Sequence, residues 1–305
     1  MTTSNTQKNI LVIGGSGLLG NAVLRTLSQD PALRVTGTLR SSALASRLLA
    51  SAPCHLEYPV DVGNFEQLRG VIERTAPDVV INCVGATKHV DSGNDASVAY
   101  IVNAVLPHSL AALCSNASAR LIQISTDCVY SGSRGRYSET DVPDANDVYG
   151  LSKAAGEVHY SHTVTLRTSI IGHEIETSRS LVEWFMRQRE CRGFTRAIFS
   201  GFPTVALARI IRDVVIPNVS LHGLYHVAAP AISKYDLLLL IAKQYGLSIN
   251  IEADSSFVLD RSLDGSRFVH ATGFQSPSWA NLIAEMHADW LINPDLFPAV
   301  SGQTR

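Results

Sequence analysis

Two residues suited to proton transfer lie four positions apart, Tyr149 and Lys153, at the start of a stretch with helical spacing. Residues i and i+4 share one face of a helix, so the phenol and the ammonium would lie side by side. A positive charge favours phenolate and lowers the pKa of a nearby tyrosine. Such a tyrosine can pass a proton to or from an alkoxide near neutral pH. The pattern predicts a catalytic pair, although the same spacing also arises by chance.

Two hydroxyl side chains, Ser125 and Thr126, end a strand-like run upstream of this pair. A hydroxyl placed beside Tyr149 could donate a hydrogen bond to the carbonyl oxygen of a substrate. The alternative is a turn in which Ser, Thr and Asp side chains hydrogen-bond their own backbone.

A glycine-rich segment near the N-terminus, GGSGLLG, provides Gly14, Gly17 and Gly20 between a predicted strand and a predicted helix. The glycines would allow a tight turn and a close approach of the backbone to a pyrophosphate. The helix would present free N–H groups to the phosphates, with Leu18 and Leu19 completing the loop. The segment therefore predicts a nucleotide site; the alternative is an ordinary glycine-rich turn.

The end of the second predicted strand indicates which nucleotide binds. It reads TLRSS and contains no acid that could hold a ribose diol. Arg40 and Ser41 could instead hold a 2′-phosphate, so the segment favours NADP(H) over NAD(H). The alternative is that Arg40 is a solvated loop residue. Asp61, followed by Val62, is expected either to hydrogen-bond the adenine or to cap the next helix.

Strands that alternate with helices must position these residues, and this order predicts βαβ units around a parallel sheet. We expect an α/β, Rossmann-type doubly wound sheet with a smaller C-terminal substrate-binding lobe. Residues 1–170 and about 204–229 would form the nucleotide domain, and 171–203 with 230–305 the lobe. The expected strands are 9–14, 34–39, 78–84, 120–125, 164–169, 223–228 and 249–253. The expected helices are 18–28, 64–75, 96–115, 148–160, 178–190, 234–245 and 278–291. Residues 193–203 are expected to form a loop.

Composition excludes several classes of protein. The chain has 305 residues, 46% hydrophobic and 17% charged, which argues against intrinsic disorder. A net charge of −2 provides no basic field for a nucleic acid or an anionic membrane. No apolar run approaches the roughly 20 residues that span a bilayer, and we expect no secretory signal before the first strand. Five cysteines without C-x-x-C spacing fit free thiols, so we expect a cytoplasmic protein with no metal.

The order of the motifs resembles that of an extended short-chain dehydrogenase/reductase. GGSGLLG, INCVGA, STDCVYSG, YGLSK and LRTSIIG occur in the sequence typical of that family. Within it, the chain looks like the dTDP-4-dehydrorhamnose reductase branch, which is carried most specifically by STDCVYSG, YSETD and YGLSKAAGE. Three later runs, GFPTVALARI, GLYHVA and LDRSLDGSRF, fit the same branch, so the resemblance covers most of the chain.

The resemblance implies NADPH-dependent reduction of a nucleotide-linked 4-keto-6-deoxysugar, in the synthesis of a deoxysugar for a surface polysaccharide. It makes Tyr149 the general acid at the C4 oxygen, and Lys153 the residue that lowers the tyrosine pKa and holds the nicotinamide ribose. Thr126 would polarise the carbonyl with Ser125 beside it, and Asn103 would support the site through a hydrogen-bonded water. The cofactor would lie along the loop that contains Cys83, Val84 and Gly85. The candidate substrate contacts are Lys88, His89, Asp127, Arg192 and Arg196; Lys88, His89 and the two arginines could equally be solvated.

Two other functions stay open. A nucleotide-sugar epimerase or dehydratase that retains NAD is disfavoured by the missing acid after the second strand. It is also disfavoured because Thr126 is followed by one acid, Asp127, rather than a pair. The second is an NADP-binding regulatory subunit without turnover, as in the methionine adenosyltransferase β subunit, because fold alone does not fix function. A homodimer is also left open.

Overall fold

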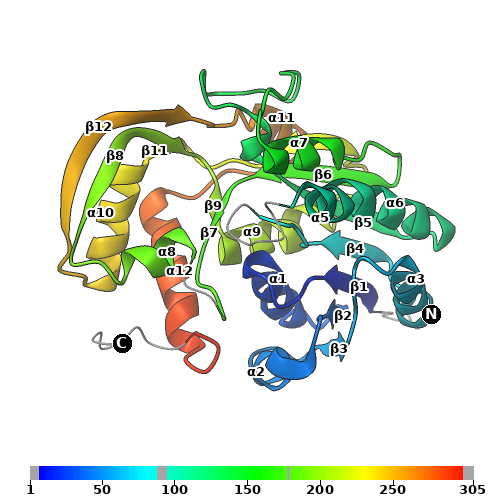
Figure 1. Ribbon diagram of the computed structural model, residues 1–305. Coiled ribbons are helices and arrows are strands. Elements are labelled where there is room, and N and C mark those ends of the chain that lie inside the picture. The colour runs from blue at the N-terminus through cyan, green and yellow to red at the C-terminus, as the bar shows by residue number, and fades with distance from the viewer. Residues whose placement is uncertain (1–6, 88–94, 177–178, 298–305) are drawn as a thin grey trace.

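A seven-stranded parallel sheet forms the centre of the computed structural model, which describes residues 7–87, 95–176 and 179–297 (Figure 1). The strand order is β10-β6-β5-β4-β1-β2-β3 and every neighbouring pair is parallel. Helices on both faces explain why its strands are apolar runs rather than alternating ones. The strands are β1 Lys8–Ile13, β2 Leu33–Thr38, β3 His55–Glu57, β4 Val79–Asn82, β5 Arg120–Thr126, β6 Thr163–Thr168 and β10 Gly223–His226.

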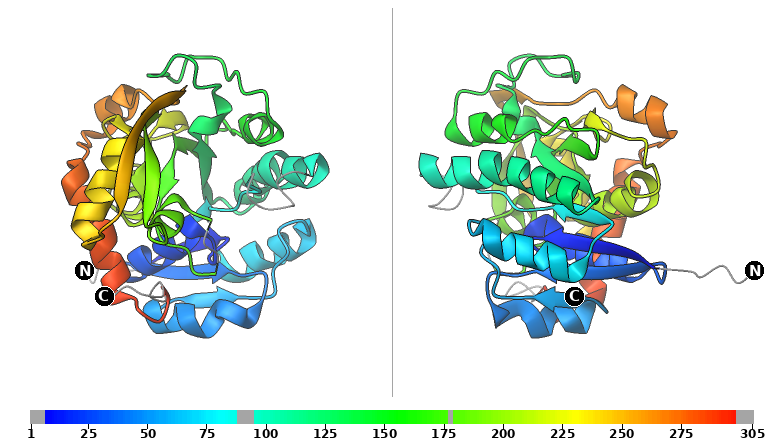
Figure 2. Two further views of the ribbon diagram at one scale, coloured as in Figure 1. Left: turned by 60° about the vertical axis from the view of Figure 1, so that its left-hand side comes forward. Right: turned by 90° about the vertical axis from the view of Figure 1, so that its right-hand side faces the viewer.

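Side chains of the first strand alternate between two hydrophobic cores. Ile10 and Val12 belong to the core that contains α1 and α9, whereas Leu11 and Ile13 belong to the core that contains α3 and α6. This alternation is the period-two geometry of a strand covered on both sides. Figure 2 shows these helices around the sheet. The bounds are α1 Leu18–Ser28, α2 Ala45–Ser51, α3 Phe65–Thr75, α5 Ala96–Tyr100, α6 Leu106–Asn116, α7 Val148–Ala155 and α9 Thr204–Ile210, with the short helical turns η1 Ser42–Leu44, η3 Asp127–Val129 and η4 Ile211–Val215.

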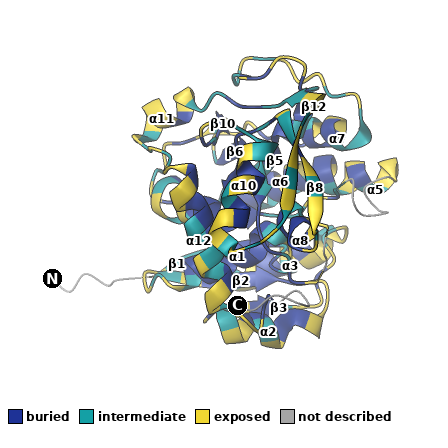
Figure 3. Ribbon diagram, turned by 90° about the vertical axis from the view of Figure 1, so that its left-hand side faces the viewer, coloured by how far each residue is buried: buried dark blue, intermediate teal, exposed yellow. Residues whose placement is uncertain are grey.

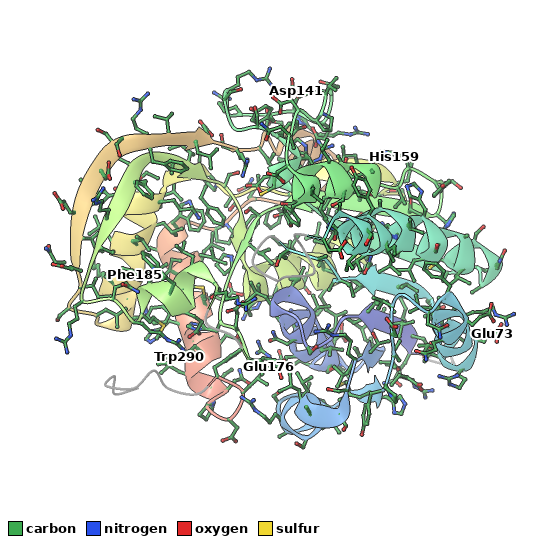
Figure 4. The ribbon with its side chains drawn as sticks, viewed as in Figure 1. Glu73, Asp141, His159, Glu176, Phe185 and Trp290 are labelled. Carbon is green, nitrogen blue, oxygen red and sulfur yellow. The ribbon has the colours of Figure 1, made fainter. Side chains whose placement is uncertain are left out.

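A second, three-stranded sheet of order β11-β8-β12 forms the lobe. Residues 193–203 were expected to be a loop; this prediction was wrong, because they form most of β8 and all of β9. Strand β8 alternates between exposed and buried residues, so it lacks the apolar run by which the inner strands were found. Figure 3 shows exposed residues along β8 and β12. The lobe contains β7 Ile170–Ile171, β8 Glu190–Phe199, β9 Phe202–Pro203, β11 Ile232–Ser233, β12 Asn250–Asp260, α8 Leu181–Phe185, α10 Lys234–Tyr245, α11 Ser266–Thr272 and α12 Trp279–Ile292. Figure 4 labels Phe185 of α8 and Trp290 of α12, which both belong to the core below this sheet.

Three expected helices have different bounds in the structure. The helix expected over 148–160 ends at Ala155, because the chain passes very close to a neighbouring helix at Gly156. A Cβ added to Gly156 would lie 1.8 Å from the Asn103 carbonyl oxygen. The helix expected over 178–190 is only α8, capped by Ser180, before the chain enters β8. The helix expected over 96–115 contains a π-helical turn, η2 Ile101–Val105, that carries Asn103.

One helical run in the described part of the chain could cross a membrane by length and composition. It is Ala96–Asn116, with a mean hydropathy of 1.5. Leu106, Leu110 and Cys114 of this run are fully buried against β1, β4 and β5. Because the core helix of a soluble protein passes the same test, the run carries no membrane assignment.

From β1 the strand order runs through β2 and β3 to one edge of the sheet, and from β4 it runs through β5, β6 and β10 to the other, so it reverses between β1 and β4. This is the topology of a Rossmann-type doubly wound fold, as predicted. In such folds ligands bind beyond the carboxyl ends of the strands, next to the point where the strand order reverses. The residues that follow β1, β2, β4 and β5 therefore define the place to look for a site.

Candidate active site

The turn after β1 has the geometry that a pyrophosphate requires. Gly14 has a φ of +86°, which glycine adopts without strain. A Cβ at Gly20 would lie 2.0 Å from the Gly14 carbonyl oxygen, so only glycine allows α1 to start this close to the turn. Helix α1 has Gly17 at its N-cap, with no side chain to occupy its first N–H groups. These free donors, which include Leu18 and Leu19, fit an anion.

The residues after β2 and β3 lie where the adenosine half of a dinucleotide would extend. Thr38 fixes the glycine turn, since its Oγ1 accepts from Gly14 N at 3.1 Å. Arg40 and Ser41 follow it and are both exposed. Asp61 does not cap α3, because Asn64 occupies that position and accepts from Gln67 N. Asp61 instead accepts from Gly63 N at 2.9 Å, so only the predicted adenine contact of Asp61, with Val62 beside it, stays a prediction.

The loop after β4 is tied to the helix that carries the tyrosine. Asn103 Oδ1 accepts from Ala86 N at 2.9 Å, and Asn103 Nδ2 donates to the Ala86 carbonyl and to Ser152 Oγ, each at 3.0 Å. Val84 N donates to Asn82 Oδ1 at 3.1 Å. Direct bonds of Asn103 thus position this loop relative to α7, and the water expected at Asn103 stays a prediction.

Tyr149 and Thr126 are brought together at the carboxyl end of the sheet. Asp147 caps α7 by accepting from Gly150 N at 2.8 Å, which fixes the first turn, where Tyr149 lies. Thr126 ends β5, and its hydroxyl accepts from Cys128 N at 3.1 Å. The Thr126 side chain also hydrogen-bonds the Tyr149 phenol. A carbonyl oxygen placed between these two hydroxyl groups could therefore contact both.

Lys153 lies one turn further along α7 and is buried. Its ammonium donates to the Ile124 carbonyl at 2.7 Å. Burial lowers the pKa of Lys153 to about 8, although Glu157 and Cys83 act in the opposite direction. The expected lowering of the tyrosine pKa is not seen: burial, followed by Cys128, raises the pKa of Tyr149 above its usual value. The reason is that partial burial disfavours phenolate and the ammonium is engaged with a backbone carbonyl.

Ser125 does not share the site with Thr126. Successive residues of a strand point to opposite faces, and the Ser125 hydroxyl donates to Glu157 Oε1 at 2.6 Å inside the protein. Glu157 also accepts from Arg167 Nε at 2.7 Å and from Arg167 Nη2 at 2.5 Å. The prediction that Ser125 contacts the substrate beside Thr126 is therefore wrong in this structure, and the residue supports the site from behind.

Two cations of the lobe reach the turn after β5, and sequence reasoning missed both. Asp127 is buried, and burial raises the pKa of its carboxyl group while Arg261 and Lys234 act to lower it. Arg261 Nε donates to the Tyr130 carbonyl at 2.7 Å. Lys234 matches no motif, and Arg261 lies in the LDRSLDGSRF run but was given no role there. Both are far from Asp127 in sequence, so only the tertiary structure shows that they approach it.

The other predicted substrate residues are less defined. Lys88 and His89 lie outside the described residues. Arg192 and Arg196 lie on β8 and are exposed, and Arg192 Nη1 lies 3.4 Å from Asp254 Oδ2 of β12. Within the described ranges, no three His, Cys, Asp or Glu side chains lie close enough to hold a metal ion, and the absence of a metal stays a prediction.

A parallel Rossmann sheet with a glycine turn after β1 and a Tyr-x-x-x-Lys helix after β5 defines the class of extended short-chain dehydrogenases/reductases. A family model described as the RmlD substrate binding domain matches residues 8–291. The chain belongs to this family, as its motifs predicted.

Similar proteins include both reductases and a subunit of an adenosyltransferase. The chain is 27% identical over 255 residues to methionine adenosyltransferase 2 subunit beta of Danio rerio, which covers 79% of this chain and 75% of that protein. It is 31% identical over 151 residues to dTDP-4-keto-6-deoxy-D-glucose reductase of Streptomyces niveus, over 48% of this chain and only 45% of that relative. The crystal structure of dTDP-4-dehydrorhamnose reductase from Bacillus anthracis in complex with NADP superposes with a TM-score of 0.77. It is 22% identical and covers 93% of this chain and 99% of that one, and at this identity it shows the fold.

Proposed function

We propose that the protein is an NADPH-dependent reductase of a nucleotide-linked 4-keto-6-deoxysugar. The observation that carries this proposal is the hydrogen-bonded Thr126–Tyr149 pair next to the buried Lys153, at the sheet edge that also carries the glycine turn. The names of the reductase relatives support the substrate class.

The residues after β1 and β2 fit NADPH. Gly14, Gly17 and Gly20 leave room and free N–H groups for the pyrophosphate. Arg40 and Ser41 are exposed at the end of β2 and would hold the 2′-phosphate. When bound, the cofactor supplies the hydride that reduces C4. The Bacillus anthracis reductase of the same fold was solved with NADP, whereas another structure of similar fold, Bordetella bronchiseptica WbmG, was solved with NAD, so the preference for NADPH rests on Arg40 and Ser41.

The side chains of the site then have distinct tasks. Thr126 donates a hydrogen bond to the C4 carbonyl oxygen and holds the carbonyl beside Tyr149. Tyr149 donates its phenolic proton to that oxygen as negative charge develops. Because burial raises the pKa of Tyr149, the phenol is protonated before the reaction, as a general acid for reduction must be. Lys153 would hold the nicotinamide ribose and offset the charge left on the phenolate.

The expected division of the chain fits this assignment. Residues 1–170 and about 204–229 would bind the dinucleotide, and 171–203 with 230–305 would bind the sugar nucleotide. A cytoplasmic location and a homodimer stay predictions, as do substrate contacts by Arg192 and Arg196.

The test is cofactor consumption by the purified protein in the presence of nucleotide-linked 4-keto-6-deoxysugars. We expect turnover with NADPH, and the product should be the corresponding 4-hydroxy sugar by mass. A purified protein that retains stoichiometric NAD would instead favour the epimerase or dehydratase class.

A second candidate is a regulatory subunit, because methionine adenosyltransferase 2 subunit beta matches 79% of this chain. This role needs dinucleotide binding without turnover. A stable complex with a partner protein, together with no consumption of NADPH by any ketosugar, would favour it.

A further inference from the structure

Two positive side chains of the lobe converge on the turn that follows Thr126. Lys234 is the first residue of α10, and its charge acts on Asp127 and Cys128. Arg261 directly follows β12, and its Nη1 lies 3.5 Å from Cys128 Sγ. The turn is therefore approached by cations from two separate lobe elements.

Lys234 meets an aromatic ring rather than an anion at close range. In the part of the chain that the structure describes, its ammonium makes no hydrogen bond and no ion pair; it lies 4.2 Å from the centroid of the Phe199 ring. Its pKa is lowered to about 8 because burial disfavours the charge, and Asp127 only partly offsets this. Its backbone position adds a further cost, because the start of a helix carries partial positive charge.

The charges at this place do not balance. Lys234 and Arg261 bring two positive charges, and both act on one carboxylate of the described residues, that of Asp127. Asp236, the acid in the first turn of α10, is exposed, and its Oδ2 accepts a hydrogen bond from Ser233 Oγ at 2.7 Å. A desolvated cation without a partner destabilises a fold, and such groups are typical of sites that await a ligand.

We propose that Lys234 and Arg261 bind an oxyanion of the substrate beside Thr126, and that Lys234 determines specificity for it. This inference rests on the proposed function in that the substrate is taken to be a nucleotide-linked sugar. Such a substrate presents an oxyanion through its diphosphate. A carboxylate on the sugar ring, which a 6-deoxysugar lacks, would point to a different nucleotide sugar, and the experiment separates the two.

The experiment measures binding by calorimetry with saturating NADP⁺, so that no turnover is needed. Three probes are compared: dTDP, UDP-glucose and UDP-glucuronate. Lys234→Met should reduce either the affinity for dTDP or the preference for UDP-glucuronate over UDP-glucose. We expect a loss of at least about tenfold, since a charged hydrogen bond is lost. Weaker dTDP binding identifies the diphosphate. An unchanged dTDP affinity with a lost preference for UDP-glucuronate over UDP-glucose identifies the sugar carboxylate.

A second readout separates this role from a structural one. Without ligand, Lys234→Met should melt a few degrees higher than wild type, because the unpaired cation is removed. Lys234→Arg should retain most of the binding. The control is Lys243→Met, which makes the same change at an exposed position in the last turn of α10. Its affinities should equal those of wild type.

The proposal is overturned if Lys234→Met leaves both quantities unchanged, if it melts lower while binding is retained, or if wild type binds none of the probes. If the protein does not reduce a ketosugar, the binding measurements on Lys234→Met keep their meaning, because equilibrium binding does not depend on turnover.

Discussion

Glu157 lies behind the proposed catalytic residues and is the carboxylate that acts on Lys153. Burial lowers the pKa of Lys153 to about 8, Glu157 and then Cys83 oppose this, and the Ile124 carbonyl accepts from the ammonium. The charged form of Lys153 is complete well below this pH and is lost as pH rises through about 8. Turnover and NADPH affinity should fall in the same range.

Glu157→Gln should move this midpoint to lower pH, because a negative charge that stabilises the ammonium is removed. The amide oxygen can still accept from Ser125 Oγ and Arg167 Nε, the bond from Arg167 Nη2 is lost, and a melting curve reports whether the fold is kept. Glu183→Gln removes a buried carboxylate that is paired with His173 in the lobe. It should leave the midpoint unchanged. An unshifted midpoint in Glu157→Gln would rule out this account of Lys153.

Arg40 tests the choice of dinucleotide. Replacing it with alanine should weaken NADPH binding about 10- to 100-fold, because a charged hydrogen bond to the 2′-phosphate is worth about 1.5–3 kcal/mol. NADH binding should not change. Arg34→Ala is the matched control, since Arg34 is exposed at the other end of β2. Equal losses for both cofactors, measured by fluorescence titration, would show that Arg40 does not read the 2′-phosphate.

The sequence predicted some site residues and missed others for a physical reason. Thr126, Tyr149 and Lys153 were found because local spacing on one strand and one helix places them. Ser125 was assigned to the wrong side, since the face of a strand that a side chain occupies depends on its packing. Lys234 and Arg261 approach Asp127 only through the fold of the lobe, and the LDRSLDGSRF run that contains Arg261 does not show where its side chain lies.

At the level of elements, the close approach of α1 to the glycine turn is the feature most sensitive to change. Gly20→Ala places a methyl group 2.0 Å from the Gly14 carbonyl oxygen, so the turn must open. We expect NADPH binding to fall by at least about tenfold and the melting temperature to drop by a few degrees.

Gly70→Ala in α3 is the matched control. A Cβ there meets only the flexible end of Arg74, at 3.1 Å. Alanine is favoured over glycine inside a helix by about 0.5–1 kcal/mol, so this variant should be as stable as wild type or more so. Equal NADPH titrations for Gly20→Ala and wild type would disprove the importance of the close approach.

Most strands of the central sheet and several helices were predictable because their hydrophobic patterns in the sequence are strong. Helices α1 and α10 have the predicted bounds, and the inner strands agree within one to two residues at most ends. Strand β8 was missed because its outer side chains are exposed and its pairing with β12 is long-range. The π-helical turn at Asn103 leaves no signal in the apolar pattern.

On the scale of the molecule, side chains connect the sheet with the lobe through the loop above α7, which carries Asp141 in Figure 4. Tyr130 stacks on Tyr137, with 4.0 Å between the ring centroids. The backbone N–H of Tyr137 donates to the Ser262 carbonyl of the lobe. Arg167 also donates to the Tyr130 hydroxyl. The Glu157–Arg167 pair behind the active site is thus joined to the lobe segment that carries Arg261.

The measurement that tests the central claim most directly is NADPH oxidation with a nucleotide-linked 4-keto-6-deoxysugar, by wild type and by Tyr149→Phe. The account predicts turnover by wild type and a loss of about 10²- to 10⁴-fold in kcat for the variant, because the general acid is removed. NADPH should still bind to Tyr149→Phe, which shows that the site is intact. Equal turnover by the two proteins, or none by wild type with any such ketosugar, would contradict it.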